Sequence, residues 1–379
     1  MIYLDNNATT AVDPAVIETV VEEMRRGPSN ASSLHRLGRA AAERIDQAMV
    51  AIGHALGAEV NVPGGPRLIM TSGGTESNNL ALGGLGQPDS PLIVSAIEHA
   101  SVLQFAEQQQ KLGRQVAVIN VRDNGVVDLD HFDELLDRYD SPIVSVMSAN
   151  NETGVIQPIE AIARRCRHQT ASLHVDATQS IGKVKVSIAE LGADAVTVTS
   201  HKFHGPAGVG ALLLAPGIKL RPGLFGGEQQ LLSRPGTEPV ALILGMAKAI
   251  QIAVENLSVN RQLMVSLRDR LESNLTAGVA GVLVHGCSVN RLPNTTCISA
   301  KGIDRQSILM ALDMAGVACS SGSACSSGSS PPSHVLTAMG CPEWAISSAV
   351  RFGVSRFSTE QEIDDASERI CRIYNKLRS

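Results

Sequence analysis

The feature that most constrains this chain is a short run of β-branched residues that ends at a lysine. Residues 196–199 alternate valine and threonine, which is typical of a buried strand. The chain then continues through Lys202, which lies between two histidines, to Gly205 and Pro206, where we expect a turn. A lysine at a strand end is usually a solvated surface residue, so this run alone does not indicate a site.

A second apolar run upstream changes this interpretation. Residues 172–175 also resemble a strand, and this strand ends on Asp176. The interval between Asp176 and Lys202 has room for one crossover and the next strand. Neighbouring parallel strands of an open α/β sheet present ligand-binding groups at their carboxyl ends. A lysine that forms a Schiff base, with an acid that keeps a pyridinium nitrogen protonated, is typical of a pyridoxal-phosphate site.

Strands and helical stretches alternate along much of the chain, which predicts a mainly parallel sheet covered on both faces. Further strands are expected at 67–71, 91–95, 116–120, 143–147 and 210–215, with helices at 15–26, 37–56 and 129–138. A long helical stretch at 240–275 leads to a smaller α+β unit with strands at 282–285, 295–299 and 349–354 and helices at 305–315 and 359–377. We place a domain boundary near Asn256. The large domain is then 16–256, and the small domain is formed by 1–15 and 257–379.

The first strand of this alternation leads into a turn rich in glycine. Residues 67–71 are followed by Ser72-Gly73-Gly74-Thr75, and we expect an apolar helix from Leu80. Free backbone N–H groups and a hydroxyl at a helix start can hold a phosphate group. The alternative is an ordinary N-cap, in which Thr75 or Ser77 caps the helix and nothing is bound.

A segment rich in serine and glycine, about 318–333, surrounds two cysteines in the small domain. No residue from 320 to 332 is large and apolar, so this segment contributes little to a core. We therefore expect Cys325 to be a solvent-reachable thiol rather than a small core residue. A flexible linker with an incidental cysteine is the alternative.

The composition is that of a globular protein with a sizeable core, with 379 residues, 44% hydrophobic and 18% charged. The net charge of −5 and the lack of long blocks of like charge argue against DNA or RNA as the main partner. No apolar run reaches membrane-spanning length, and the N-terminus has no basic region, so we expect neither a membrane span nor a signal peptide. The seven scattered cysteines favour a reducing, cytoplasmic setting. We predict no metal site.

Specific motifs span nearly the whole chain, in the order DNNATT, SGGTESNN, EHASV, NNETG, HVDATQ, SHKFHGPAG, RPGTEP, SSGSACSSGS and RFGVSRF. With these motifs the sequence resembles the cysteine desulfurases of the NifS/IscS-like branch, in the class V aminotransferase family. The resemblance implies a homodimeric pyridoxal-phosphate enzyme of the aspartate-aminotransferase fold. That fold has a large domain with a mainly parallel seven-stranded sheet and a smaller α+β domain.

The resemblance also implies roles for individual residues. Lys202 would carry the cofactor covalently, Asp176 would hold its ring nitrogen, and Gln179 would face its phenolic oxygen. His99 would stack on the ring and move protons. The phosphate would be held by Gly74, Thr75, Thr199 and His201, with Thr237 reaching in from the other subunit.

The substrate, L-cysteine, would be bound through its carboxylate by Asn151 and Arg351, and Asn151 is also assigned to the cofactor. Arginine suits this task because it binds a carboxylate through two parallel hydrogen bonds. Asn30 belongs to a loop that matches the family's asparagine-containing active-site loop.

The implied reaction removes sulfur from L-cysteine. The thiolate of Cys325 would attack the substrate sulfur and leave alanine and a persulfide on Cys325. A sulfur-acceptor protein, either an iron–sulfur scaffold or a sulfurtransferase, would receive the sulfur for iron–sulfur clusters, other thio-cofactors or tRNA. One alternative is a C–S or C–Se lyase that releases sulfur or selenium from cysteine, cystine or selenocysteine by β-elimination and does not need Cys325. Another is an idle pyridoxal-phosphate fold that serves as a sulfur-carrier scaffold.

Several positions depart from the family's pattern. Leu231 and Leu232 stand where relatives usually have arginine and glycine, and Pro331 stands where an acidic residue is common. Cys319 stands where small residues are usual. Cys319 is either an inert small side chain or a thiol that reacts with the persulfide or pairs with Cys325 on oxidation.

Overall fold

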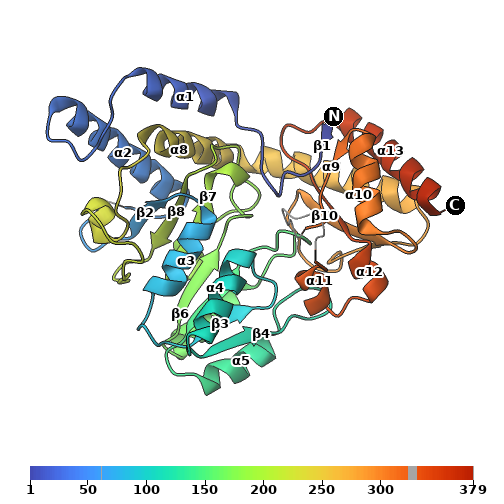
Figure 1. Cartoon of the computed structure of the whole chain (residues 1–379), viewed down its shortest axis with the longest axis horizontal. Coiled ribbons are helices and arrows are strands. Elements are labelled where there is room, and N and C mark those ends of the chain that lie inside the picture. The colour runs from blue at the N-terminus through green and yellow to red at the C-terminus, as the bar shows by residue number, and fades with distance from the viewer. Residues whose placement is uncertain (61, 323–330, 379) are drawn as a thin grey trace.

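The computed structural model describes residues 1–60, 62–322 and 331–378 (Figure 1). Within these residues the largest sheet has seven strands, in the order β2-β8-β7-β6-β5-β3-β4. Their bounds are β2 Arg67–Thr71, β3 Leu92–Ser95, β4 Val116–Ile119, β5 Ile143–Met147, β6 Ser172–Asp176, β7 Ala195–Thr199 and β8 Gly210–Leu214. Only β8 runs antiparallel to its neighbours, β2 and β7. The predicted sheet is therefore confirmed.

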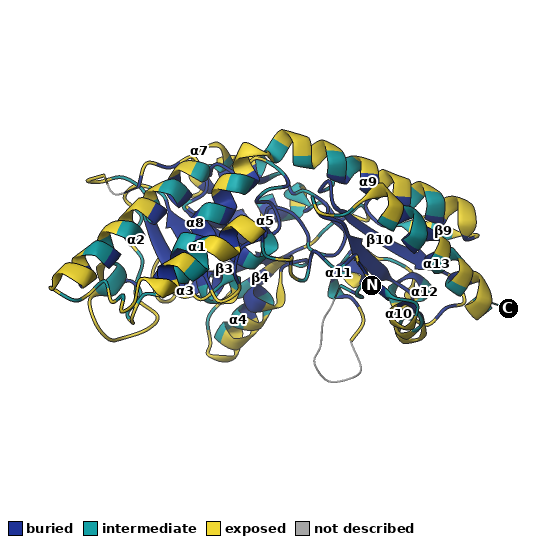
Figure 2. Cartoon of the chain, turned by 90° about the horizontal axis from the view of Figure 1, so that it is seen from above, coloured by how far each residue is buried: buried dark blue, intermediate teal, exposed yellow. Residues whose placement is uncertain are grey.

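Side chains alternate between the two faces of this sheet, and each face has its own core. On one face Leu68, Met70, Val196 and Val198 are buried under α1 (Pro14–Arg25), α2 (Arg36–Ala55) and α8 (Val240–Glu255). On the other face Ile69 and Leu212 are buried under α3 (Gly74–Gly84) and α4 (Ala100–Lys111). Figure 2 shows the buried strands between helices whose outer sides are exposed. The predicted cover on both faces is confirmed.

The remaining elements of this part of the chain lie around the sheet. They are α5 Leu129–Arg138, α6 Ile159–His168, α7 Ile188–Leu191 and the 3₁₀ helices η1 Ser200–Lys202 and η2 Gln229–Leu232. Helix α3 begins at Gly74 and not at Leu80, so the predicted start was wrong. The polar residues Ser77 and Asn78 hid the first turn from a reading based on apolar spacing, because both are buried and bonded to other side chains.

A second core surrounds a three-stranded antiparallel sheet of order β12-β10-β9. Its elements are α9 Leu257–Gly278, β9 Val282–Val284, β10 Thr295–Ala300, α10 Arg305–Met314, β11 Val317–Ala318, α11 His334–Ala338, α12 Glu343–Ser347, β12 Val350–Gly353 and α13 Glu360–Arg378. Helices α9 and α13 pack against each other along one side (Figure 1). The division into domains at 256 stays a prediction.

The N-terminal segment joins this second core. Strand β1 (Ile2–Tyr3) pairs in parallel with β11, and Ile2 and Leu4 are buried with the apolar residues of α9 and α13. Beyond β1, the backbone N–H of Asn6 donates to Gly353 O at 3.2 Å. The polar residues that follow are thereby placed between the two cores.

The expected helical stretch at 240–275 consists of two helices. Helices α8 and α9 meet at Asn256 and are bent by 74° relative to each other. Together they have the length and apolar composition of a broken membrane span, but no single helix of the described residues is long and apolar enough to cross a membrane.

Candidate active site

The predicted lysine lies just beyond the end of β7. Strand β7 ends at Thr199, η1 follows at once, and Lys202 is the last residue of η1. Its Nζ donates to Asn7 O and Ala8 O, both at 2.6 Å. Burial and the positive charge of Arg351 together lower the pKa of Lys202 to about 8, against the opposing effects of Asp5 and Asp176. An amine with this pKa is partly neutral near pH 7 and is available as a nucleophile or base.

The predicted acid lies at the end of the neighbouring strand. Asp176 is buried, and each of its carboxylate oxygens accepts a hydrogen bond: Oδ2 from Asn78 Nδ2 at 2.8 Å and Oδ1 from the Thr178 N–H at 2.9 Å. Strands β6 and β7 are parallel neighbours, as expected. The sheet therefore brings Asp176 and Lys202 to the same edge.

His99 belongs to the same group. It caps α4, and its Nδ1 accepts from the Ser101 N–H at 3.1 Å. His99 is an exposed residue, but the protein atoms around its ring disfavour the charged form and lower its pKa. Lys202 acts in the same direction and Asp176 in the opposite one, which places all three residues within electrostatic reach of one another.

The glycine-rich turn forms an open helix start at this edge. The N-cap of α3 is Gly73, whose φ of 152° requires glycine, and no side chain caps the helix. The alternative of an N-cap by Thr75 or Ser77 is therefore wrong. A Cβ on Gly74 would lie only 3.2 Å from Thr178 Oγ1, which is buried and has no hydrogen-bond partner in the described part of the chain. Free backbone N–H groups and an unused hydroxyl suit a phosphate group.

Two further predicted residues line this region. The side chain of Thr199 lies near Gly74, at 3.7 Å from where a Cβ of that glycine would stand. His201 Nδ1 is 3.2 Å from Thr9 Oγ1, and burial next to Lys202 lowers the pKa of His201 to about 4. His201 is therefore a neutral imidazole at physiological pH.

A guanidinium group from the second core completes the site. Arg351 on β12 is buried, and its Nη2 donates to Asp5 Oδ1 and Ser320 Oγ, both at 2.7 Å. Its Nη1 donates to Asn151 O at 3.1 Å, whereas Nε is buried without a partner among the described residues. The backbone oxygen of Asn151 thus contacts Arg351, whereas the role of both residues in binding the substrate carboxylate stays a prediction.

Gln179 connects this group to the N-terminal segment. Its Nε2 donates to Asn7 O at 3.0 Å, and that oxygen also accepts from Lys202. The predicted residues from β6, β7, η1, α3, α4 and β12 thus converge on one region.

Three predicted residues are not part of this group in the described chain. Asn30 and Thr237 are exposed, and within the described residues no hydrogen bond joins either of them to Lys202. Their loops meet each other instead, because Gln229 Nε2 donates to Ser32 Oγ at 3.2 Å. Cys325 lies outside the described residues.

The departures from the family's pattern have structural consequences. Gln230, Leu231 and Leu232 all have positive φ angles, of 51°, 53° and 63°, and both leucines are exposed. Positive φ is strained for leucine and suits glycine, which is the residue expected at position 232. Burial raises the pKa of Cys319 to about 12, which favours the inert interpretation of that thiol.

The sequence analysis missed the main-chain carbonyls of Asn7 and Ala8, the Asp176 partner Asn78, and Lys183, whose Nζ donates to Gln179 Oε1 at 3.2 Å. DNNATT was used only as one of the motifs that carry the resemblance, and no contact was assigned to it. Its signal was available, because the polar run follows an apolar strand directly, as the runs after β6 and β7 do.

These groups fit pyridoxal phosphate. Lys202 offers an amine for the carbonyl carbon, Asp176 a buried carboxylate for the ring nitrogen, and α3 an uncapped N-terminus with the unused Thr178 hydroxyl for the phosphate. No group of three or more His, Cys, Asp or Glu side chains within the described ranges is placed to hold a metal ion.

Comparison with known proteins agrees with this arrangement. Residues 2–365 match the family of class-V aminotransferases. The chain is 38% identical to a cysteine desulfurase of a Nostoc species over 100% of this chain and 94% of that protein, and 40% identical to a cysteine desulfurase of Sinorhizobium fredii over 100% and 97%. The solved structure of a NifS-like protein from Rickettsia africae superposes with a TM-score of 0.90, at 34% identity and 99% coverage of both chains.

Proposed function

This chain belongs to the class-V aminotransferase family, and we propose that it is a pyridoxal-phosphate-dependent cysteine desulfurase that uses the thiol of Cys325. The function is supported by curated cysteine desulfurases that match the whole chain at 37–40% identity. One structural observation carries the proposal for this site. The amine of Lys202, the carboxylate of Asp176 and the guanidinium of Arg351 converge from three strands on one region.

Each residue has a task that follows from its surroundings. When bound, pyridoxal phosphate withdraws electrons from the substrate's Cα and so makes its proton acidic. Lys202, as a partly neutral amine with a pKa of about 8, takes that proton and returns one. Hydrogen bonds from Asn78 and the Thr178 N–H hold the Asp176 carboxylate in the position where it would face the ring nitrogen.

Arg351 binds the substrate carboxylate. Its Nη2 is held by Asp5 and Ser320, and its Nε is buried and unused among the described residues. A carboxylate that takes the place of Asp5 or Ser320 would accept two parallel hydrogen bonds, from Nε and Nη2, and would be fixed relative to Lys202. We propose that Asn151 supports this orientation and that His99 stacks on the cofactor.

The sulfur transfer requires a second thiol. The Cys325 thiolate attacks the sulfur of the bound cysteine, so that an S–S bond forms and the substrate's Cβ–S bond breaks. The electron pair of that bond stays with the substrate, which takes up protons and leaves as alanine. The enzyme retains a persulfide on Cys325, which it then passes to an acceptor.

The remaining assignments also stay proposals. We propose a homodimer, in which the exposed Asn30 and Thr237 serve the partner's site, because no hydrogen bond joins either residue to Lys202 within the described part of the same chain. The acceptor is a sulfur-carrier or scaffold protein, and the setting is the cytoplasm. The domain division at 256 belongs with these proposals.

The deciding experiment measures alanine and sulfide production from L-cysteine, with and without reductant, for wild type, Cys325→Ser and the control Cys287→Ser. Cys287 is a free, exposed cysteine and should be dispensable. We expect Cys325→Ser to bind the cofactor and to lose turnover by at least about 10³-fold. Cys287→Ser should keep wild-type activity.

A Cys325→Ser variant that releases sulfide at the wild-type rate contradicts the persulfide route. In that case the enzyme is a β-eliminating lyase. A wild-type protein that binds no cofactor contradicts the proposal as a whole and leaves only a sulfur-carrier scaffold.

A further inference from the structure

A second buried lysine lies next to the proposed catalytic lysine. Lys183 is only 5% exposed, and among the residues that the structure describes its Nζ has one hydrogen-bond partner, Gln179 Oε1 at 3.2 Å. A lysine ammonium group has three donors, so a buried lysine with one acceptor and no ion pair is costly to the fold. A lysine that is buried at such a cost to the free energy of folding is a candidate for a functional role.

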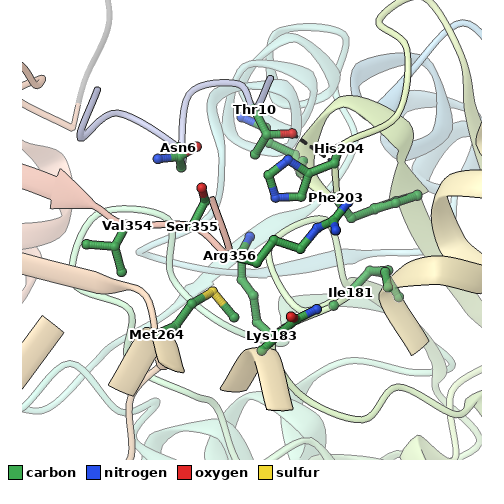
Figure 3. A pocket seen from close by; sticks show the side chains of 14 residues that line it. Asn6, Thr10, Ile181, Lys183, Phe203, His204, Met264, Val354, Ser355 and Arg356 are labelled. Carbon is green, nitrogen blue, oxygen red and sulfur yellow. Dashed lines mark hydrogen bonds between the residues drawn. The ribbon is translucent and has the colours of Figure 1, made fainter. Parts of the chain in front are cut away.

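Lys183 and Lys202 line the same small cavity. Figure 3 shows Lys183 at this cavity together with Met264, Ser355 and Arg356. The cavity has a volume of about 20 Å³, enough for one water molecule. Lys183 therefore borders the proposed site on the side where this cavity lies.

A continuous set of hydrogen bonds joins the two lysines. Lys183 donates to Gln179 Oε1, Gln179 Nε2 donates to Asn7 O at 3.0 Å, and Lys202 donates to the same oxygen at 2.6 Å. The side chain of Gln179 is thus held at both ends.

The chemistry of lysine determines which way this carboxamide points. A charged lysine can only donate, so only the oxygen of Gln179 can face Lys183. The amide nitrogen must then face the opposite way, towards Asn7 and the site. With an apolar residue at position 183, only the bond from Nε2 to Asn7 O would hold the carboxamide in this direction.

Charge provides a second connection. Burial lowers the pKa of Lys183 to about 7, and the positive charges of Lys202 and Arg351 contribute to this shift. Lys183 in turn lowers the pKa values of His201 and His204, and Arg356 lies across the cavity. No carboxylate forms an ion pair with Lys183 among the described residues. The groups that face Lys183 are therefore cationic or neutral bases.

We propose that Lys183 is a positioning residue, whose buried amine orients the carboxamide of Gln179 and whose positive charge disfavours a positive charge on Lys202. The inference rests on the proposed function, because Gln179 and Lys202 face the cofactor only in that proposal. Lys183 thereby helps to keep Lys202 available as a base at pH values where Lys183 itself is protonated.

The test follows the absorbance of the cofactor bound to Lys202 in the holoenzyme as a function of pH. The variants are Lys183→Met, Lys183→Arg and the control Lys185→Met, which changes an exposed lysine two positions away. Methionine removes the charge, so we expect the titration midpoint to rise by about half a pH unit or more. Arginine keeps a permanent charge, so the midpoint should stay or fall. Lys185→Met should match wild type.

A double-mutant cycle tests the contact through Gln179. Gln179→Leu and Lys183→Met should each weaken cofactor binding to the enzyme. Their combination should weaken it by less than the product of the two fold-changes, because both remove the same oriented contact. The readout is the dissociation constant of pyridoxal phosphate, measured by fluorescence.

Midpoint shifts of the same sign in Lys183→Met and Lys183→Arg, no shift in either, or an additive double mutant would overturn the inference and assign Lys183 to the fold alone. Those outcomes leave the proposed function intact if wild type shows the cofactor band and produces alanine. A wild type without that band overturns both proposals.

Discussion

The two sheets supply the proposed site in different ways. In the seven-stranded sheet, Asp176 and Lys202 follow the ends of two parallel neighbours, β6 and β7. In the three-stranded sheet, Arg351 sits within the antiparallel strand β12, and its partners Asp5 and Asn151 are 346 and 200 positions away in the sequence. The first set is placed by topology and the second by long-range packing.

The difference shows what a sheet contributes to a site. A parallel sheet collects the carboxyl ends of its strands at one edge, so side chains there meet without special contacts. An antiparallel sheet has no such edge, and Arg351 depends on the N-terminal segment and Ser320 for its orientation. A substitution in the first region should therefore remove chemistry alone, whereas one in the second should also disturb the structure.

The largest effect is expected at the parallel edge. Lys202→Ala removes both the amine that carries the cofactor and the base, so alanine production should fall by at least about 10³-fold. The midpoint of thermal unfolding should not fall. The substitution removes the hydrogen bonds of a half-buried amine, but it also removes the free-energy cost of keeping that amine away from water. Kinetics and calorimetry check these two outcomes, with Lys219→Ala, an exposed lysine, as the control. A strong loss of stability would contradict the idea that strand order alone positions the side chains at this edge of the sheet.

A smaller effect, on both substrate binding and thermal stability, is expected at the antiparallel sheet. Arg351→Lys cannot make parallel hydrogen bonds to a carboxylate, so KM for cysteine should rise by about 10- to 100-fold, with a smaller change in kcat. The variant should also unfold at a lower temperature, because contacts to Asp5 and Asn151 are lost.

The matched control for Arg351 is Arg270→Lys. Arg270 makes a comparable two-bond contact to Asp364, but both side chains are exposed. It should therefore change neither KM nor stability measurably. If Arg351→Lys altered KM without any change in stability, the contrast between the two sheets would fail.

The smallest effect is expected at Glu98, which accepts a hydrogen bond from the Met147 N–H at the end of β5. Glu98 is buried, and burial raises its pKa to about 8. The folded state therefore binds more protons than the unfolded state between pH 4.5 and about 8, and the resulting stabilisation is full below pH 4.5 and lost as the pH rises to about 8.

Glutamine imitates the protonated carboxyl group, so Glu98→Gln should keep its contacts to Ser95 and Met147. Its unfolding midpoint should fall less than that of wild type across this pH range. Thermal unfolding at a series of pH values, with exposed Glu107→Gln as the control, tests this. Equal slopes for wild type and Glu98→Gln would contradict a protonated Glu98.

Much of the fold was predictable from the sequence. Apolar runs bounded by polar turns located the strands around Asp176 and Lys202, because a buried parallel strand leaves a continuous apolar pattern. The start of α3 was missed since Ser77 and Asn78 are buried for their hydrogen bonds and break the apolar spacing.

The site itself was only partly predictable. Asp176 and Lys202 followed from strand order, whereas Arg351 and His99 followed only from resemblance to a family. Lys183 carried no signal, because a lysine in a turn has the same pattern when it is exposed as when it is buried. The polar run after residue 4 showed that this segment could belong to the site, but not that the carbonyls of Asn7 and Ala8 point at Lys202. The direction of these carbonyls depends on the hydrogen bonds of the segment to Ala318 and Gly353.

The position of the first eight residues has a consequence for the newly made protein. These residues leave the ribosome long before their partners, since β1 pairs with Val317 and Ala318, and Asp5 bridges to Gly353. The seven-stranded sheet lies between them in the sequence and can form before these contacts, as domains generally fold during synthesis. The carbonyl partners of Lys202 therefore reach their final position only after β11 and β12 have emerged, and a chain that stops before β12 cannot assemble the complete site.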